Sequence, residues 1–170
     1  PGESMKTNAI KNTLRTLLGE NLTAHIHGIW FLRLIKSKPL PDPEVDYLRL
    51  LNLKNTLAVD VGANGANWTK ALSEMVGSSG SVIGFEAHPY YFKATSAAVF
   101  YDKSMSTNSV IYPMAISDKD SRLKLLTQEN GKHLDGESRI VNLKETDTCD
   151  GVIEDIDALT LDNFLSKRFA

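Results

Sequence analysis

The stretch 57–69, with the sequence LAVDVGANGANWT, constrains the fold of this chain more than any other. It begins with a short run of apolar and β-branched residues, which is typical of a strand buried on both faces. Two glycines, Gly62 and Gly65, then break the run before a helical pattern begins. Glycine permits a tight turn and a close approach of backbone to ligand, and the free N–H groups at the start of the helix point back into the turn. We therefore expect a strand, a ligand-binding loop and a helix.

Asp60 narrows the choice of ligand. The two glycines are spaced G-x-x-G, and Asn64 stands where the dinucleotide fingerprint G-x-G-x-x-G has its middle glycine. A carboxylate immediately before the turn repels a pyrophosphate and favours a cation. S-adenosylmethionine carries an ammonium and a sulfonium group, so this carboxylate predicts that cofactor. An ordinary strand-to-helix turn without a ligand is the alternative that this stretch alone leaves open.

A second carboxylate, Glu86, ends the next predicted strand, 81–86. A carboxylate about 20 residues beyond a glycine-rich βα turn is placed to accept hydrogen bonds from the ribose hydroxyls of an adenosine. By itself, Glu86 is more typical of a strand end exposed to solvent. Together with Asp60 it predicts two strand-end carboxylates on either side of one ligand.

Residues 5–54 predict a helical cap. Apolar residues at helical spacing indicate one helix over 5–18, ended by Gly19, and a second over about 23–36, stopped by the prolines that follow. A third short helix is expected over 45–51, leading into the first strand.

The residues after the glycine loop alternate between helix and strand. We expect a helix over 68–76, a strand over 81–86 and a helix that begins at Pro89, where a missing N–H costs little. A strand over 109–116 follows, and Pro113 marks it as an edge strand. This alternation predicts the strand order 3-2-1 of one half of a doubly wound sheet.

Beyond Asp118 the pattern changes. Residues 122–127 and 138–143 predict a β-hairpin. Five carboxylates within 146–157 do not have the spacing of a calcium-binding loop, and we interpret this segment as a solvated acidic loop. A final helix is expected with Thr160 as its N-cap.

Four segments together are similar to the FkbM-type S-adenosylmethionine-dependent methyltransferases. They are 59–65 (VDVGANG), 82–89 (VIGFEAHP), 112–120 (YPMAISDKD) and 159–165 (LTLDNFL). The second motif of that family is usually F-E-P, and here two residues separate Glu86 from the proline.

The resemblance implies an α/β fold: a class I methyltransferase, Rossmann-like parallel sheet with an N-terminal helical cap. It also implies O-methyl transfer to a small-molecule or sugar hydroxyl. The cofactor-binding residues that it implies are Asp60, Gly62, Ala63, Asn64 and Gly65 around the methionine part, Glu86 at the ribose, Ala87 and His88 beside the adenine, and Ala115 and Asp118 at the pocket edge. No catalytic base is identified.

In the resembled family, the T-L-D segment is followed by a further strand and the second half of the sheet. The chain ends at Ala170, so the second half is expected to be missing and the central strand to keep an unpaired edge. Such an edge favours association with a second copy by strand addition or swapping. The expected organisation is a tag remnant at 1–4, the helical region 5–54 and the cofactor-binding domain 55–170.

Composition limits the other partners. A net charge of −2 over 170 residues leaves no overall positive charge for nucleic acid, and a single cysteine fits a reducing, cytoplasmic location. The sequence has no apolar run of the length that a membrane span needs, so no membrane partner is expected. The sequence also predicts no metal site.

Two other functions stay open from the sequence. The first is a non-catalytic nucleotide-binding or assembly module that keeps the loop and associates through its exposed sheet edge. The second is a nicotinamide-dependent oxidoreductase, which would share Glu86 but conflicts with Asp60 and with the absent G-x-G-x-x-G.

Overall fold

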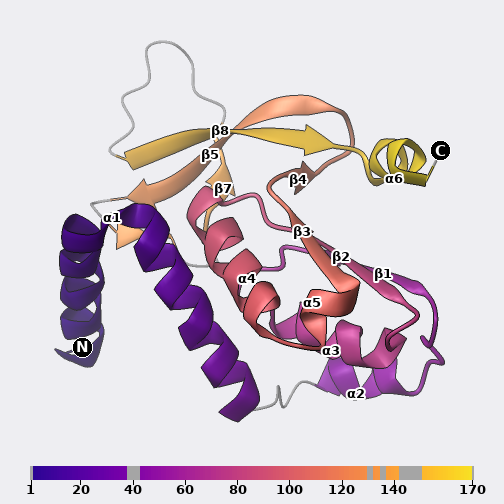
Figure 1. Cartoon of the computed structure of the whole chain (residues 1–170). Helices are drawn as coiled ribbons and strands as arrows, with labels where there is room; N and C mark the ends of the chain where they lie inside the picture. Colours follow the sequence, from indigo (N-terminus) through magenta and orange to yellow (C-terminus); the bar gives the residue numbers. More distant parts are fainter. Residues whose placement is uncertain (1, 38–42, 130–131, 135–136, 142–150, 170) are drawn as a thin grey trace.

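The computed structural model describes residues 2–37, 43–129, 132–134, 137–141 and 151–169 (Figure 1). Its first element, α1 (Gly2–Ser37), has a kink at Gly19, where φ is 76° and ψ is 159°. This positive φ is readily adopted only by glycine, so the residue divides α1 into two limbs. The predicted break between two helices at Gly19 is therefore confirmed. A short helix, α2 (Pro43–Arg49), follows as expected.

Three strands form a parallel sheet in the order β1-β2-β3, as the alternation of helix and strand predicted. They are β1 (Leu57–Val61), β2 (Ser81–Phe85) and β3 (Ser109–Tyr112). The register places Asp60 beside Gly84 and Val61 beside Phe85, so β1 and β2 end at the same edge of the sheet. Within the described residues, β1 pairs only with β2, and its other edge is open.

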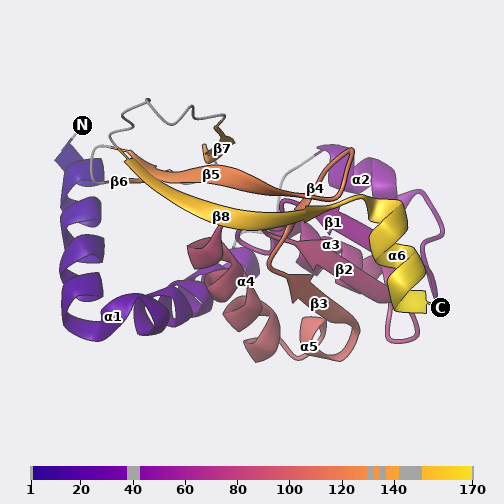
Figure 2. The ribbon, with the colours of Figure 1, turned by 90° about the horizontal axis from the view of Figure 1, so that it is seen from above.

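Helices join these strands and pack on the sheet. They are α3 (Asn67–Val76), α4 (Pro89–Tyr101) and the short α5 (Met105–Asn108). The second limb of α1 lies along α4 in both views of the molecule (Figures 1 and 2). The two helices approach closely at Gly28, where an added Cβ would lie 2.2 Å from the carbonyl oxygen of Ala94.

A second, curled sheet contains both parallel and antiparallel pairs and follows the parallel one. The prediction of a single strand over 109–116 is wrong, because this segment forms two strands in different sheets. Pro113 ends β3, and the chain resumes as β4 (Ala115–Ile116) in the second sheet. The other strands of this sheet are β5 (Ser121–Glu129), β6 (Lys132–His133), β7 (Arg139–Ile140) and β8 (Gly151–Leu159). The predicted hairpin is confirmed in part, since Leu125 of β5 pairs with Ile140 of β7, while residues 142–143 lie outside the described ranges.

The expectation of a solvated acidic loop is wrong for residues 151–157, which form most of β8. Its buried residues alternate with exposed carboxylates: Ile156 and Ala158 are buried, whereas Asp155 and Asp157 face solvent. The two carboxylates lie 3.3 Å from Lys124 Nζ and 3.4 Å from Arg122 Nε, on the antiparallel neighbour β5. Asp147 and Asp150 lie outside the described residues.

The last element, α6 (Leu161–Phe169), begins as predicted, with Thr160 Oγ1 accepting the backbone N–H of Asn163 at 3.1 Å. Phe164 of α6 packs edge-on against Phe85 and Tyr112, each at a ring-centroid distance of 4.8 Å. The chain is thus a mixed α/β fold in which α6 covers part of the parallel sheet. None of the helices in the described ranges is long and apolar enough to cross a bilayer.

Candidate functional site

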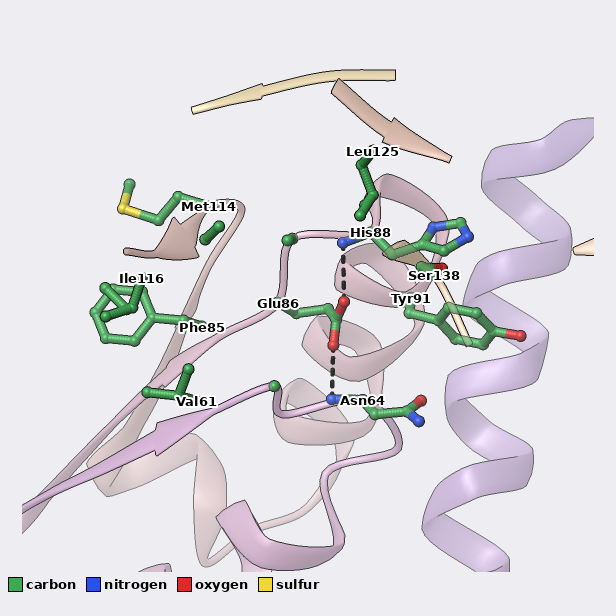
Figure 3. Close-up of a pocket in the computed structure, with 13 residues that line it drawn as sticks. Val61, Asn64, Phe85, Glu86, His88, Tyr91, Met114, Ile116, Leu125 and Ser138 are labelled. Carbon is green, nitrogen blue, oxygen red and sulfur yellow. Dashed lines mark hydrogen bonds between the residues drawn. The ribbon is translucent and has the colours of Figure 1, made fainter. Parts of the chain in front are cut away.

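A cavity of about 380 Å³ lies where β1 and β2 end, between the parallel sheet and the second sheet (Figure 3). Its volume is in the range of small-molecule sites. The cavity is lined by residues from the glycine loop, the end of β2, α4 and the second sheet: Val61, Gly62, Asn64, Phe85, Glu86, Ala87, His88, Tyr91, Met114, Ala115, Ile116, Leu125 and Ser138.

The loop after β1 turns sharply over the end of β2. Gly62 has a φ of 84°, and the N–H groups of Gly62 and Ala63 both donate to the carbonyl oxygen of Phe85 at 2.9 Å. Asn64 and Ala66 also have positive φ, of 35° and 65°. This left-handed backbone directs the N–H of Asn64 toward the next strand, and it is the reason why glycine and asparagine occur here.

Glu86 is the centre of the site. Its Oε2 accepts the backbone N–H of Asn64 at 2.8 Å, and its Oε1 accepts that of His88 at 2.8 Å (Figure 3). A carboxylate has about four lone-pair positions, so about two remain for hydrogen bonds from a ligand. Glu86 as a whole residue is 8% exposed, and it lines the cavity. The structure thus holds a fixed, buried hydrogen-bond acceptor at the end of β2.

Burial raises the pKa of the Glu86 carboxyl above its ordinary value of 4.5. The two N–H donors oppose this rise, because they stabilise the charged form, and the negative charge of Asp60 adds to it. A cationic or hydroxyl-rich ligand would compensate the desolvated charge.

Asp60 does not line the cavity. Its carboxylate is buried on the α3 side of the sheet, where Oδ2 accepts the hydroxyl of Thr69 at 2.6 Å. Burial raises the pKa of Asp60 above 3.8, and the hydrogen bonds from Thr69 oppose the rise. Of the two strand-end carboxylates predicted on either side of one ligand, only Glu86 lines the cavity, because Asp60 is directed toward Thr69 of α3.

Of the ten residues predicted for the site, six line one cavity: Gly62, Asn64, Glu86, Ala87, His88 and Ala115. Ala63 is instead buried in the core, and Gly65 packs against Phe31 of α1, which would lie 3.3 Å from an added Cβ. Asp118 is exposed, and its Oδ1 accepts the hydroxyl of Ser117 at 3.1 Å.

His88 has a structural role beside the cavity. Its Nδ1 accepts the backbone N–H of Tyr90 at 3.2 Å, so the residue caps α4 and its ring proton is assigned to Nε2. The ring also meets that of Tyr91 edge-on, with centroids 4.7 Å apart. The ring of His88 is thereby fixed at the wall of the cavity.

The sequence did not indicate several cavity residues. Tyr91 lies in the first turn of α4, two residues after Pro89. Because the sequence predicts that this helix begins at Pro89, beside Glu86, it could have indicated that Tyr91 lies near the site. Leu125 and Ser138 reach the cavity only because the second sheet folds over the end of the first (Figure 3). No local pattern carries that information.

Asn64 contributes a second polar group. Its Oδ1 is buried and has no hydrogen-bond partner among the described residues. A buried acceptor of this kind is costly unless a ligand or water satisfies it. In the part of the chain that the structure describes, no three histidine, cysteine or acidic side chains are grouped to hold a metal ion.

Comparisons of the chain with protein-family models, with curated proteins and with solved structures find no match. The fold and the site define a mixed α/β protein with a cavity at the ends of two parallel strands, where one buried carboxylate, Glu86, lines the wall.

Proposed function

We propose that this chain is the cofactor-binding part of an S-adenosylmethionine-dependent methyltransferase. The three parallel strands would be the first half of a class I methyltransferase sheet. The observation that carries the proposal is the position of Glu86, held by the N–H groups of Asn64 and His88 at 2.8 Å and facing a cavity. Its remaining lone pairs suit the two ribose hydroxyls of an adenosyl ligand.

The cavity has complementary groups for the rest of that ligand. Gly62 and Asn64 line it on the side of the β1 loop, where the methionine part of the ligand would lie. Ala87 and Tyr91 line it on the side of α4, where an adenine would have apolar contacts. The buried charges of Asp60 and Glu86 favour a cation over a pyrophosphate.

The proposed reaction is O-methylation of a small molecule or sugar. The methyl group leaves the sulfonium, which becomes a thioether, and forms a bond with an acceptor oxygen that loses its proton. Such a transfer depends on aligning oxygen, methyl carbon and sulfur.

A non-catalytic nucleotide-binding or assembly module is the second candidate. The open edge of β1 favours it, because an unpaired strand edge is a template for pairing with another chain. In this candidate the cavity still binds a nucleotide, but no methyl group is transferred and no methyl-accepting substrate is needed.

Calorimetric titration with S-adenosylmethionine, S-adenosylhomocysteine and NAD tests the proposal. We expect both adenosyl ligands to bind and NAD to give no heat. Binding of NAD without either adenosyl ligand would overturn the proposal in favour of an oxidoreductase. Binding of the adenosyl ligands, with no methyl transfer to a panel of sugars and small hydroxyl compounds, would favour the binding module.

A further inference from the structure

Strand β1 leaves one of its edges unpaired. Among the described residues it pairs with β2 alone, and it lies at the end of the order β1-β2-β3 (Figure 1). An open strand edge presents a row of N–H and C=O groups with which another strand can pair. The edge therefore requires an extended segment as its occupant, because only an extended backbone can pair with alternate residues along its whole length.

The free backbone groups of this edge belong to three residues. The N–H of Gly62, just beyond β1, donates to the carbonyl oxygen of Phe85 at the end of β2. Backbone groups alternate in direction along a strand, so the even-numbered residues of β1 also face β2. The N–H and C=O groups of Leu57, Val59 and Val61 therefore face the open edge.

The side chains of the same three residues are apolar and share one face. Val59 packs there against the core cluster that includes Phe164. Leu57 and Val61 are 41% and 58% exposed. Asp60, the one charged residue of the strand, has its carboxylate on the opposite face. β1 thus lacks the lysine, proline or bulge that commonly protects an exposed edge.

A second copy of β1 fits this edge when it runs antiparallel about a two-fold axis at Val59. Val59 then faces Val59 of the second copy, and Leu57 faces its Val61. These are the residues whose backbone groups point outward, so each of those groups finds a partner. On the other face, Asp60 lies opposite Ala58 of the second copy, and no like charges are opposed.

Other registers satisfy fewer groups. An axis at Asp60 would place two carboxylates opposite each other and leave Leu57 without a partner in the strand. An axis at Ala58 would leave Val61 without one. An axis between two residues would set outward-facing groups against residues that face β2. The edge is therefore self-complementary in one register, as an isologous two-fold interface requires.

We propose that β1 pairs with β1 of a second copy, antiparallel and centred on Val59. The two parallel sheets would then form one continuous sheet in the order β3-β2-β1-β1-β2-β3. Leu57 and Val61 would cover each other across the interface and lose their exposure to water. The pairing depends on the edge of β1 and not on the proposed cofactor. A strand of a different protein is the competing occupant, and it would have to supply the apolar residues that a second copy already has.

Sedimentation velocity of the full chain over a range of concentrations tests the pairing. We expect a monomer–dimer equilibrium. Leu57→Lys should raise the dissociation constant of the dimer at least tenfold, because it places a lysine at the paired edge. Leu50→Lys is the matched control, since Leu50 is 81% exposed and lies outside β1. It should dimerise as the parent chain does, and far-UV circular dichroism should show both variants folded. A parent chain that stays monomeric up to about 100 μM would overturn the proposal, as would equal dimerisation by Leu57→Lys.

Disulfide cross-linking tests the register and needs no disruptive substitution. Cys149 is the single cysteine of the sequence, so the variants are made in a Cys149→Ser background. Val59→Cys should form a cross-linked dimer on mild oxidation, because directly paired residues of antiparallel strands have Cα atoms about 5.5 Å apart, within reach of a disulfide. Val61→Cys is the control. Its two copies would lie about 14 Å apart, although the position is more exposed.

Cross-linking of Val61→Cys as fast as that of Val59→Cys would overturn the antiparallel register. A dimer in which Val59→Cys does not cross-link would overturn the proposal and assign the dimer to another surface.

Discussion

The backbone N–H of Asn64 donates to Oε2 of Glu86 at 2.8 Å, and this bond joins the loop after β1 to the end of β2. The other carboxylate oxygen holds the N–H of His88 at the start of α4. One side chain at the end of β2 therefore fixes two other segments that line the proposed cofactor cavity, the glycine loop and the start of α4. Substitutions at Glu86 should affect the shape of the site as well as its charge.

Glu86→Gln should weaken binding of S-adenosylmethionine at least tenfold and lower stability by about 1–3 kcal/mol. An amide has only one oxygen, so its NH₂ group would face the N–H of either Asn64 or His88, and one buried donor would lose its acceptor. Calorimetry and thermal unfolding measure the two effects.

Asp118→Asn is the matched control for this substitution, since Asp118 is an exposed carboxylate that does not line the cavity. It should change neither affinity nor unfolding midpoint. Unchanged affinity in Glu86→Gln would remove Glu86 from the ligand site and contradict the proposed function.

The local motifs of the site were predictable because they depend on neighbours in the sequence. Glycine at a position of positive φ and a carboxylate at a strand end are both visible in the residues themselves, and they predicted the turn at Gly62 and the acceptor at Glu86. The side on which Asp60 lies was not visible, because the strand directs its carboxylate toward Thr69 of α3 instead of into the cavity.

The second sheet shows the limit of local patterns more clearly. The acidic residues of β8 predicted a solvated loop, although they form a strand, in which carboxylates are normally depleted. They are tolerated because Arg122 and Lys124, about 30 residues earlier in the sequence, lie beside Asp157 and Asp155 on β5. The same long-range pairing brings Leu125 to the cavity, so both facts depend on a contact between distant segments.

Asp60→Asn should raise the thermal midpoint of the free protein at pH 7. Burial raises the pKa of this carboxyl above 3.8, so the folded state binds the proton more tightly than the unfolded state does. The stability contributed by this group therefore falls as the pH rises from the unfolded pKa through the folded pKa, and the ionised group destabilises the fold at pH 7. Asparagine removes that charge and keeps an oxygen for the Thr69 hydroxyl.

The expected rise is roughly 2–4 °C, which corresponds to about 1 kcal/mol in a domain of this size. It should disappear near pH 3, where the aspartate is neutral in both states. A lower midpoint at pH 7 would mean that the charged hydrogen bonds from Thr69 outweigh the cost of burial. Affinity for S-adenosylmethionine should fall in the same variant, because the cation loses a nearby negative charge.

Binding of S-adenosylmethionine should weaken on acidification from pH 7.5, beginning above the ordinary pKa of a glutamate. Burial raises the pKa of Glu86 above 4.5, and protonation removes the charge that attracts the cation. Calorimetry over a pH series measures this dependence, and Glu86→Gln should flatten most of it. Constant affinity of the parent chain over the whole series, down to the ordinary glutamate pKa of 4.5, would contradict the role assigned to the carboxylate.

Gly62→Ala should lower stability by about 1–2 kcal/mol through backbone strain alone. The φ of Gly62 is 84°, and an added Cβ would meet no atom within 4 Å, so no steric clash contributes. Gly77→Ala is the matched control, since Gly77 also has a positive φ and open space but ends α3 away from the cavity. Both variants should lose stability, and only Gly62→Ala should also lose ligand affinity.

Gly28→Ala should loosen the contact between α1 and α4. An added Cβ would lie 2.2 Å from the carbonyl oxygen of Ala94 and 2.7 Å from the Cβ of Ala97, so the helices must move apart. The overpacking should cost about 1–3 kcal/mol and outweigh the gain of about 1 kcal/mol in helix propensity. Asn21→Ala, on the exposed part of the same limb, has the propensity gain without the clash and should raise the midpoint. Equal stabilisation by both substitutions would mean that α1 does not pack against α4 at Gly28. In that case, the amides of α1 near Gly28 would exchange their hydrogens as fast as those on the exposed part of the limb.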